Sequence, residues 1–166
     1  MFKKILLVAA LILPMLASAQ TLKIGLVDTQ EILSKLPDTA AANKQLEETS
    51  KKYEDEYAKL NEEMKRLYDE IQNMGESELP AIRERKTREF TDHQQKAQQF
   101  EQNAMQHLQK LQGDLMQPIM QKIRTAIESV GKEGGYSLVQ EMSTQIYYAA
   151  PVVDITPEVK AKLGVK

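Results

Sequence analysis

The stretch from residue 53 to residue 74, YEDEYAKLNEEMKRLYDEIQNM, carries a regular apolar repeat in a strongly charged background. Its apolar side chains recur at alternating intervals of four and three residues, and Leu46 lies one heptad upstream of the first. They are Tyr53, Tyr57, Leu60, Met64, Leu67, Ile71 and Met74. Such spacing over about four repeats is typical of one strand of a coiled coil. The stretch therefore predicts a long helix whose narrow apolar seam needs a partner.

A second long helix is predicted after a short break. Gly75 suits the end of one helix and Pro80 the first turn of the next, which places a tip at about 75–80. The returning helix has its own apolar series, with an eleven-residue repeat: Ala97, Phe100, Ala104, Leu108, Leu111, Leu115 and Ile119. An eleven-residue repeat drifts in the opposite sense to a heptad. We therefore predict an antiparallel helical hairpin over 39–130, packed loosely in places and starting from a cap at Asp38 or Thr39.

Strands are predicted on both sides of the hairpin. The segment TLKIGLVD (21–28) alternates apolar and polar side chains, as a half-buried strand does. The segments 134–142 and 145–155 are rich in Tyr, Val and Ile and are predicted to be two strands, joined by a short turn at Ser143 and Thr144.

Two short helices are predicted next to these strands. Asp28 or Thr29 can cap a helix that Pro37 ends. Thr156 is the predicted cap of a last helix, which Gly164 stops. The predicted fold class is α+β, a small oligomeric β-body with a long, protruding, antiparallel coiled-coil hairpin in each chain.

The predicted β-body is too small to form a stable core alone. Its segments, 20–38 and 131–166, amount to about 55 residues, and the chain has no cysteine to add a disulfide. Three short strands also leave unpaired edges. We therefore predict an obligate homo-oligomer that shares its sheet between chains. The residues assigned to the interface are Leu22, Ile24, Leu26, Leu138, Val139, Ile146 and Tyr148.

Residues 1–19 have the pattern of a secretory signal peptide. Lys3 and Lys4 precede a short apolar run, and the small residues Ala17-Ser18-Ala19 follow it. The apolar run is shorter than the roughly 20 residues that a membrane-spanning helix needs. The pattern predicts export, with cleavage after Ala19 and a mature chain that begins at Gln20.

Composition argues against several classes of function. The 24 acidic residues outnumber the 22 basic ones, which disfavours nucleic acid as a partner. His93 and His107 have no third ligand at metal spacing, so neither a metal nor another cofactor is predicted. No motif supplies a nucleophile or a general base. The chain is therefore not expected to be an enzyme.

The tip is the one strongly basic stretch. In AIRERKTR (81–88) four cations accompany the single carboxylate of Glu84. The cations are Arg83, Arg85, Lys86 and Arg88. They are predicted to contact either an anionic membrane surface or acidic segments of a client protein. The alternative is that they form an ordinary solvated helix end.

Four segments carry a resemblance to a known family. KIGLVDTQEIL (23–33) precedes the hairpin, QKAQQFEQ (95–102) lies in its returning helix, and YSLVQE (136–141) and VVDITPEV (152–159) follow. In this order they resemble the Skp/OmpH family of periplasmic chaperones over essentially the whole mature chain. The resemblance implies a homotrimer whose β-body is built by three chains and whose arms enclose a cavity. Unfolded outer-membrane β-barrel proteins are held there without ATP.

The chain departs from better-known members in its charge. Those members are strongly basic, whereas this chain has a formal net charge of −2, and no lipopolysaccharide-binding set can be assigned to its residues. The other function considered is a periplasmic structural adaptor, whose hairpin docks to another envelope component. The segments outside 39–130 leave little room for the modules that flank the hairpin in such adaptors.

Overall fold

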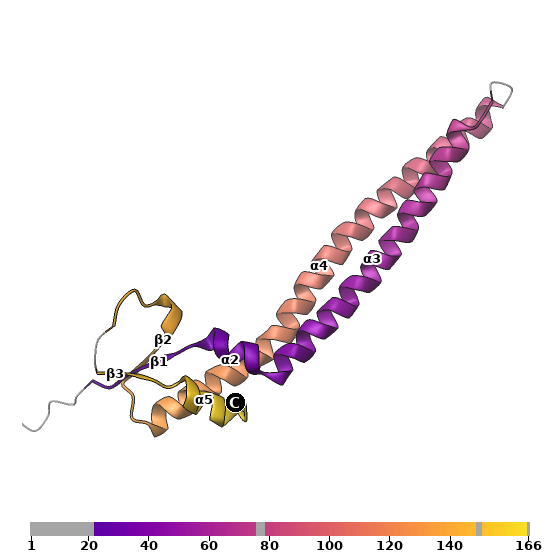
Figure 1. Cartoon of the computed structure of the whole chain (residues 1–166). Coiled ribbons are helices and arrows are strands. Elements are labelled where there is room, and N and C mark those ends of the chain that lie inside the picture. Colours follow the sequence, from indigo (N-terminus) through magenta and orange to yellow (C-terminus); the bar gives the residue numbers. More distant parts are fainter. Residues whose placement is uncertain (1–21, 76–78, 149–150, 166) are drawn as a thin grey trace, which may run out of the picture. The chain divides into compact units, whose positions relative to one another are not determined.

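The computed structural model describes residues 22–75, 79–148 and 151–165. Its elements are the strand β1 (Ile24–Val27), the helices α2 (Thr29–Lys35), α3 (Pro37–Gln72) and α4 (Pro80–Glu133), the strand β2 (Leu138–Glu141), the 3-10 helix η2 (Met142–Thr144), the strand β3 (Val152–Asp154) and the helix α5 (Thr156–Leu163) (Figure 1). The predicted α+β class, with a helical hairpin and a small sheet, is confirmed. The predicted signal peptide and its cleavage site lie outside the described residues.

The chain divides into two compact units. One is Leu33–Lys122, which contains most of the helical hairpin, and the other combines the segment up to Ile32 with the segment from Ile123 onward. We call them the hairpin unit and the sheet unit. Among the described residues, no helix has both the length and the apolarity needed to cross a membrane.

Helix α3 confirms the heptad seam. The seam residues from Tyr53 to Met74 are all buried or half-buried, and Leu67 is only 5% exposed. The predicted start was wrong, because the helix begins at Pro37 rather than after a cap at Asp38 or Thr39. Proline suits the first position of a helix because its φ is already helical. The amide N–H that proline lacks would have no hydrogen-bond partner within the helix at this position.

Helix α4 confirms the second apolar series. Ala97, Ala104 and Ile119 are 3%, 8% and 5% exposed, and the other four members of the series are half-buried. The helix has 54 residues and continues through Pro118. Its last turns belong to the sheet unit, so that unit gains core residues that the predicted boundary at 131 had assigned to the hairpin.

The sheet has the strand order β2-β1-β3, and both outer strands are parallel to β1. Ile24 of β1 pairs with Leu138 on one side and with Val152 on the other. The prediction that strands over 134–142 and 145–155 are joined by a short turn at Ser143 and Thr144 was therefore wrong. Residues 145–148 are not strand, and two strands parallel to a common neighbour cannot be joined by a two-residue hairpin turn.

The core of the sheet unit combines all its segments. Its buried apolar residues are Leu26, Val27, Ile32, Ile123, Ala126, Val130, Ile155 and Val159. Gly25 lies in the central strand, where an added Cβ would be 3.2 Å from the Tyr136 ring and 3.4 Å from Ile155. Because Gly25 has no side chain, the Tyr136 and Ile155 side chains can pack directly on β1.

Polar contacts at the strand ends fix the helices of the sheet unit. Asp28 caps α2 as predicted, because its Oδ1 accepts a hydrogen bond from the Glu31 amide at 2.8 Å. Gly164 ends α5 in the left-handed conformation, with a φ of 75°, also as predicted. The predicted cap at Thr156 was wrong, since α5 begins at Thr156 itself. Its buried hydroxyl instead accepts a hydrogen bond from the Asp28 amide at 2.9 Å.

Candidate functional site

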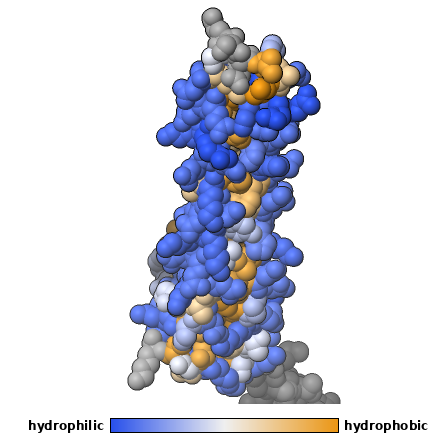
Figure 2. All heavy atoms as spheres, turned by 90° about the vertical axis from the view of Figure 1, so that its right-hand side faces the viewer, coloured by the Kyte–Doolittle hydropathy of each residue, from blue (hydrophilic) through white to orange (hydrophobic). Residues whose placement is uncertain are grey.

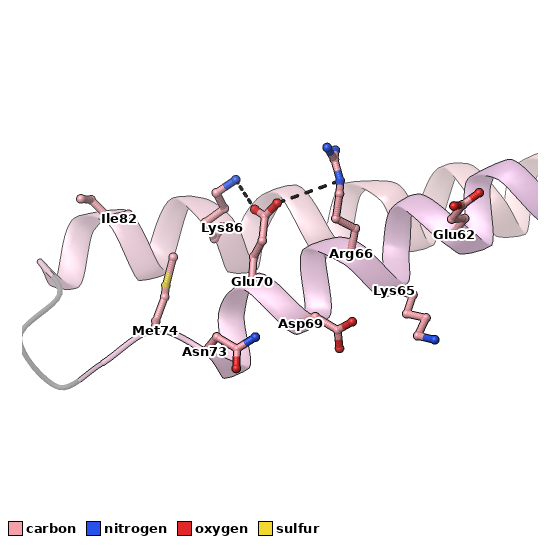
Figure 3. A pocket seen from close by; sticks show the side chains of 9 residues that line it. All are labelled: Glu62, Lys65, Arg66, Asp69, Glu70, Asn73, Met74, Ile82 and Lys86. Atoms are coloured by element: carbon pink, nitrogen blue, oxygen red, sulfur yellow. Dashed lines mark hydrogen bonds and ion pairs between the residues drawn. The ribbon is translucent and has the colours of Figure 1, made fainter.

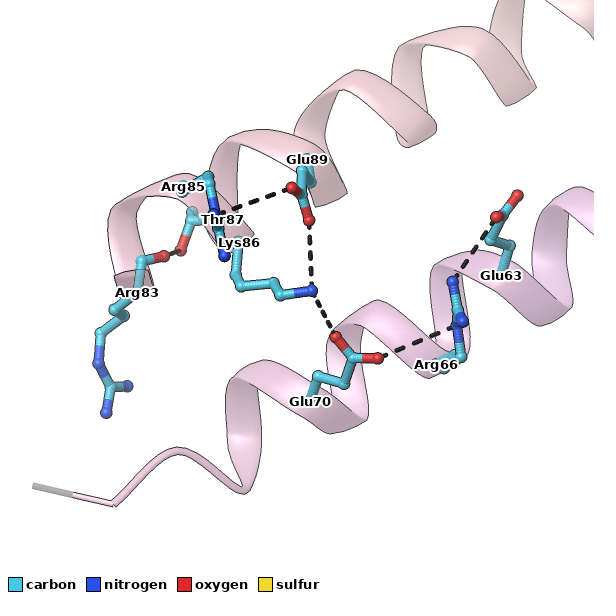
Figure 4. Close-up of polar contacts among 8 residues, drawn as sticks. All are labelled: Glu63, Arg66, Glu70, Arg83, Arg85, Lys86, Thr87 and Glu89. Carbon is cyan, nitrogen blue, oxygen red and sulfur yellow. Dashed lines mark hydrogen bonds and ion pairs between the residues drawn. The ribbon is translucent and has the colours of Figure 1, made fainter. Parts of the chain in front are cut away.

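A cluster of charged side chains joins the two helices of the hairpin near its tip. We call Glu70 on α3 with Lys86 and Glu89 on α4 the tip cluster. The Lys86 Nζ lies 2.7 Å from a Glu70 carboxylate oxygen and 3.4 Å from a Glu89 oxygen (Figure 4). Arg66 approaches the other Glu70 oxygen at 4.0 Å. Glu70 therefore receives two cations, one from each helix.

The contacts within the tip cluster shift two pKa values in opposite directions. The hydrogen bond from Lys86 lowers the pKa of Glu70 below its ordinary value, and the Coulombic effects of Lys86 and Arg66 act in the same direction. The hydrogen bond to Glu70 raises the pKa of Lys86, with Glu89 contributing further. Both groups are charged at neutral pH, so the bridge between the helices is intact there.

Acid is expected to weaken this bridge. The pKa of Glu70 is lower in the folded hairpin than in the unfolded chain, so its stabilising contribution is present above an unfolded pKa of about 4.3 and is lost as the pH falls through the folded value. Replacing Lys86 by Gln should move the pKa of Glu70 back toward the ordinary value. An NMR titration of the Glu70 side-chain carbon checks this, and equal pKa values of Glu70 in the two proteins would contradict the bridge.

The four cations predicted to contact a partner have different surroundings. Arg83 donates hydrogen bonds from Nη2 to the carbonyl oxygens of Met74 at 3.0 Å and Gly75 at 3.4 Å, where it satisfies backbone groups beyond the end of α3. The Lys86 side chain is only 24% exposed. Arg85 and Arg88 each approach a carboxylate one turn away, but their side chains remain 67% and 72% exposed. Arg83 is also exposed but is held by these backbone bonds, so Arg85 and Arg88 are the cations whose side chains are available without breaking a contact to the end of α3.

The seam pattern identifies why Lys86 lies between the helices. Continued backward from Ala97 in steps of four and three, the apolar series of α4 reaches His93, Phe90 and Lys86. These residues are half-buried, although two of them are polar. A cation at a seam position of a helix pair is expected to find a carboxylate on the partner helix. The sequence-based prediction missed this signal because it considered only the number of cations in 81–88. It did not extend the apolar spacing of α4 back to Lys86.

An open groove of about 750 Å³ lies beside the tip cluster (Figure 3). Met74 and Ile82 contribute its apolar lining, and Asn73 a neutral polar group. The charged lining residues are balanced in sign and comprise Glu62, Asp69 and Glu70 with Lys65, Arg66 and Lys86. This balance gives the groove no preference for an anionic ligand, which weakens the expectation of a broad anion-binding tip.

The seam of the hairpin is only partly covered. On the face shown in Figure 2, apolar side chains form a narrow stripe between hydrophilic borders. Two helices alone leave most of their seam residues half-buried, including Tyr53, Phe100 and Leu108. Met105 and Met120, beside the seam on α4, are 65% and 44% exposed. The hairpin thus presents weakly apolar surface over much of its length, bordered by charged residues.

The sheet unit exposes a second set of apolar side chains. They are Leu22, Leu138, Ile146, Tyr147, Tyr148 and Val153, and Ile146 is fully exposed. Four of them were predicted to form an oligomer interface, and Tyr147 and Val153 are additions. The predicted Ile24 and Val139 are half-buried. Leu26 is 2% exposed in the core of its own chain, so it is removed from this surface.

The two histidines of α4 have separate surroundings, His93 half-buried at a seam position and His107 exposed beside the seam. The Nδ1 atom of His93 is 3.6 Å from a Glu63 oxygen, and the His107 ring lies edge-on to Tyr53 with the ring centroids 5.7 Å apart. Within 22–75, 79–148 and 151–165, no three potential ligands are grouped as a metal site requires.

Comparisons with known proteins agree with this architecture. The OmpH family model, described as outer membrane protein (OmpH-like), matches residues 23–163. The chain is 29% identical to the chaperone protein Skp of Yersinia enterocolitica over 163 residues, which cover 95% of this chain and 96% of that protein. The crystal structure of an OmpH-like outer membrane chaperone from Caulobacter crescentus has the same fold, with a TM-score of 0.75 at 12% identity, covering 88% of this chain and 86% of that one. The chain therefore belongs to the OmpH-like family, the Skp/OmpH chaperones that its sequence motifs predicted.

Proposed function

We propose that the chain is an ATP-independent holdase of the periplasm, which binds unfolded outer-membrane β-barrel proteins and prevents their aggregation. The observation that carries this proposal is the half-exposed apolar stripe along the hairpin. An unfolded β-protein has apolar side chains and unpaired strand edges, and these drive its aggregation. A stripe with charged borders offers weak apolar contacts while the borders keep the chaperone itself soluble.

The proposal includes a homotrimer joined through the sheet units. The apolar side chains exposed there, among them Leu138, Ile146 and Tyr148, supply a surface that a second chain would cover. The outer strands β2 and β3 each pair with β1 on one side only within the described sheet, so both have an edge available. In the trimer the three hairpins would enclose the client between them.

Client binding is proposed to be weak at each contact and strong in sum. Several stripes acting on one flexible chain raise the effective concentration of every further contact, so avidity does not need a single tight site. Exposed methionines such as Met105 suit this role because the thioether side chain is flexible and polarizable. Release then follows when the client reaches a more stable state in the membrane.

Contact of the hairpin tip with an anionic membrane surface is a narrower part of the proposal. It depends most on Arg85 and Arg88, whose side chains are 67% and 72% exposed, whereas Arg83 bonds the carbonyl oxygens beyond α3 and Lys86 bridges to Glu70. Exposed cations near an anionic bilayer contribute about 1 kcal/mol each. No cofactor or catalytic residue has a part in the proposal.

An aggregation assay tests the holdase function. A urea-unfolded outer-membrane β-barrel protein is diluted into buffer without ATP, with or without the mature chain, and light scattering is recorded. At about one trimer for each client, scattering should be suppressed almost completely. Unchanged client aggregation at a several-fold excess would contradict a holdase and favour the structural adaptor, which has no need to bind unfolded protein.

A further inference from the structure

The hairpin unit contains a small apolar recess between its helices, halfway along the seam. Its volume is about 170 Å³, and its walls come from both helices. The apolar walls include Tyr53 and Tyr57 of α3 and Phe100, Ala104, Met105 and Leu108 of α4. We call this space the seam recess. Within the hairpin unit it lies away from the tip cluster.

The recess exists because a small side chain occupies a seam position. Ala104 is 8% exposed and lies in the series that continues with Leu108, Leu111 and Leu115. Because the alanine side chain is much smaller than the leucine side chains that follow it in the seam of α4, it leaves a gap opposite α3. The eleven-residue period of α4 and the heptad of α3 do not match, so the gap is not closed by a shift of the helices.

Aromatic contacts hold the walls of the recess in place. The Tyr53 ring meets Phe100 edge-on at a centroid distance of 5.7 Å and an interplanar angle of 63°. His107 meets the same ring at 5.7 Å and 68°. A ring held by two edge-on partners is not free to swing into the space beside it. The recess is therefore formed before any ligand arrives, which lowers the entropic cost of binding.

The size and lining of the recess fit one aromatic side chain. An engineered apolar cavity of about 150 Å³ in another protein holds a benzene molecule, so about 170 Å³ has room for a single ring. Met105, 65% exposed, lies at the recess and can fold its thioether over an inserted ring.

The charged groups of the recess are all acidic among its described lining residues. Glu54 and Glu101 contribute carboxylates, one from each helix, and no lysine or arginine lines the space. Both residues are exposed, and Glu54 also accepts a hydrogen bond from the Ser50 hydroxyl at 3.1 Å. A ligand with a cation beside its ring would meet these carboxylates. Exposed ion pairs of this kind contribute little to the binding free energy. The two carboxylates would therefore favour cationic ligands over anionic ones without providing most of the affinity.

We propose that the seam recess binds an aromatic side chain of an extended polypeptide that carries a lysine or arginine two residues away. In an extended chain, residues i and i+2 point to the same side and lie about 6.6 Å apart, so one segment can offer both groups to the recess and its rim. This inference rests on the proposed holdase function, because it names the client feature that one part of the stripe recognises.

A peptide titration of the full mature chain tests the proposal. The probe is an unstructured Gly/Ser peptide with one Phe and a Lys two residues to each side of it. The Ala104 and Met105 methyl signals are followed by NMR. Both signals should shift with the probe. A probe with Ala in place of Phe should bind at least tenfold more weakly, and one with Glu in place of Lys several-fold more weakly.

Two variants locate the binding within the recess. Ala104→Leu fills the space and should weaken binding of the probe at least tenfold, whereas Ala58→Leu makes the same change at an exposed position of α3 and should leave binding unchanged. Glu54→Gln with Glu101→Gln keeps the packing. It should leave the Phe preference intact and bring the Lys and Glu probes to nearly equal affinity, which is a readout that misfolding cannot imitate.

Several results would overturn the proposal. They are equal binding of the Phe and Ala probes, equal binding when Leu replaces Phe, and unchanged binding by Ala104→Leu. A shift of the two methyl signals on concentrating the protein alone would show that a second copy fills the recess, and would also overturn it. Failure of the holdase function is seen separately, in the aggregation assay. If client aggregation is suppressed while the probes leave both methyl signals unmoved, only the recess assignment fails.

Discussion

Replacing Ile155 by Ala is expected to lower the free energy of unfolding of the sheet unit by about 2–5 kcal/mol. The Ile155 side chain is fully buried, and its atoms lie 3.4 Å from where a Cβ on Gly25 would be. Its amide also donates a hydrogen bond to the Leu26 carbonyl at 2.8 Å. Truncation leaves a cavity against the central strand, where the surrounding backbone of β1 has little freedom to collapse.

Hydrogen exchange of the β1 amides measures this loss within the sheet unit, which the strong helical signal of circular dichroism would obscure. Ile155→Val serves as the graded control and should cost only about 0.5–1.5 kcal/mol, because it removes a single methylene. If the Ala and Val variants exchange at the same rate, Ile155 does not hold the sheet as described.

Replacing Leu67 by Asp is expected to destabilise the distal part of the hairpin by about 3–5 kcal/mol. Leu67 is the most deeply buried seam residue of α3, at 5% exposure. The change loses about 2 kcal/mol of stabilisation from apolar burial. It also places a carboxylate between the helices, and this charged group can be hydrated only if the two helices separate locally. Since the proposed stripe depends on the paired helices, protection of a client should fall as well.

The control for Leu67→Asp is Lys65→Asp, which introduces the same side chain two residues away at an exposed position. Lys65→Asp should change the stability of the hairpin by less than about 0.5 kcal/mol, as most surface substitutions do. Amide exchange along α3 and α4 distinguishes the two variants. Similar exchange in both would mean that burial of the Leu67 position contributes little to the hairpin.

Local patterns made the hairpin predictable from the sequence. The intervals of four and three from Tyr53 to Met74 record which side of a helix is covered, and the observed burial follows them residue by residue. Helix ends were predictable where the residue at the end favours a single backbone conformation, as glycine does after the last turn of a helix. Gly164 adopts the left-handed conformation that a helix stop requires, whereas the Thr156 hydroxyl, predicted to cap α5, accepts a hydrogen bond from the Asp28 amide just after β1.

Strand order was not predictable, because it depends on contacts between distant segments. The composition of 145–155 indicates strand, yet among the described residues of this segment only Val152–Asp154 pairs, and it pairs with β1 rather than with the preceding strand. Leu26 was misplaced for the same reason. Alternation showed that one face of its strand is apolar, but did not show that the chain itself buries Leu26, which is only 2% exposed.

The candidate site was predictable only in outline. The basic composition of 81–88 identified the tip as unusual but did not distinguish Lys86, which bridges the helices, from Arg85 and Arg88, which remain exposed. The seam recess depends on the combination of Ala104 with two fixed aromatic rings across a pair of helices, and no single-sequence pattern records a gap of that kind.

The mass of the client complex in solution is the most direct test of whether three hairpins enclose one client. Mature chain is mixed with an unfolded outer-membrane β-barrel protein, and native mass spectrometry is recorded at micromolar concentration. A trimeric holdase should give one dominant species that contains three chains and a single client, together with free trimer. A stable single chain that carries no client, or that binds it one to one, would contradict the enclosure of the client by three hairpins.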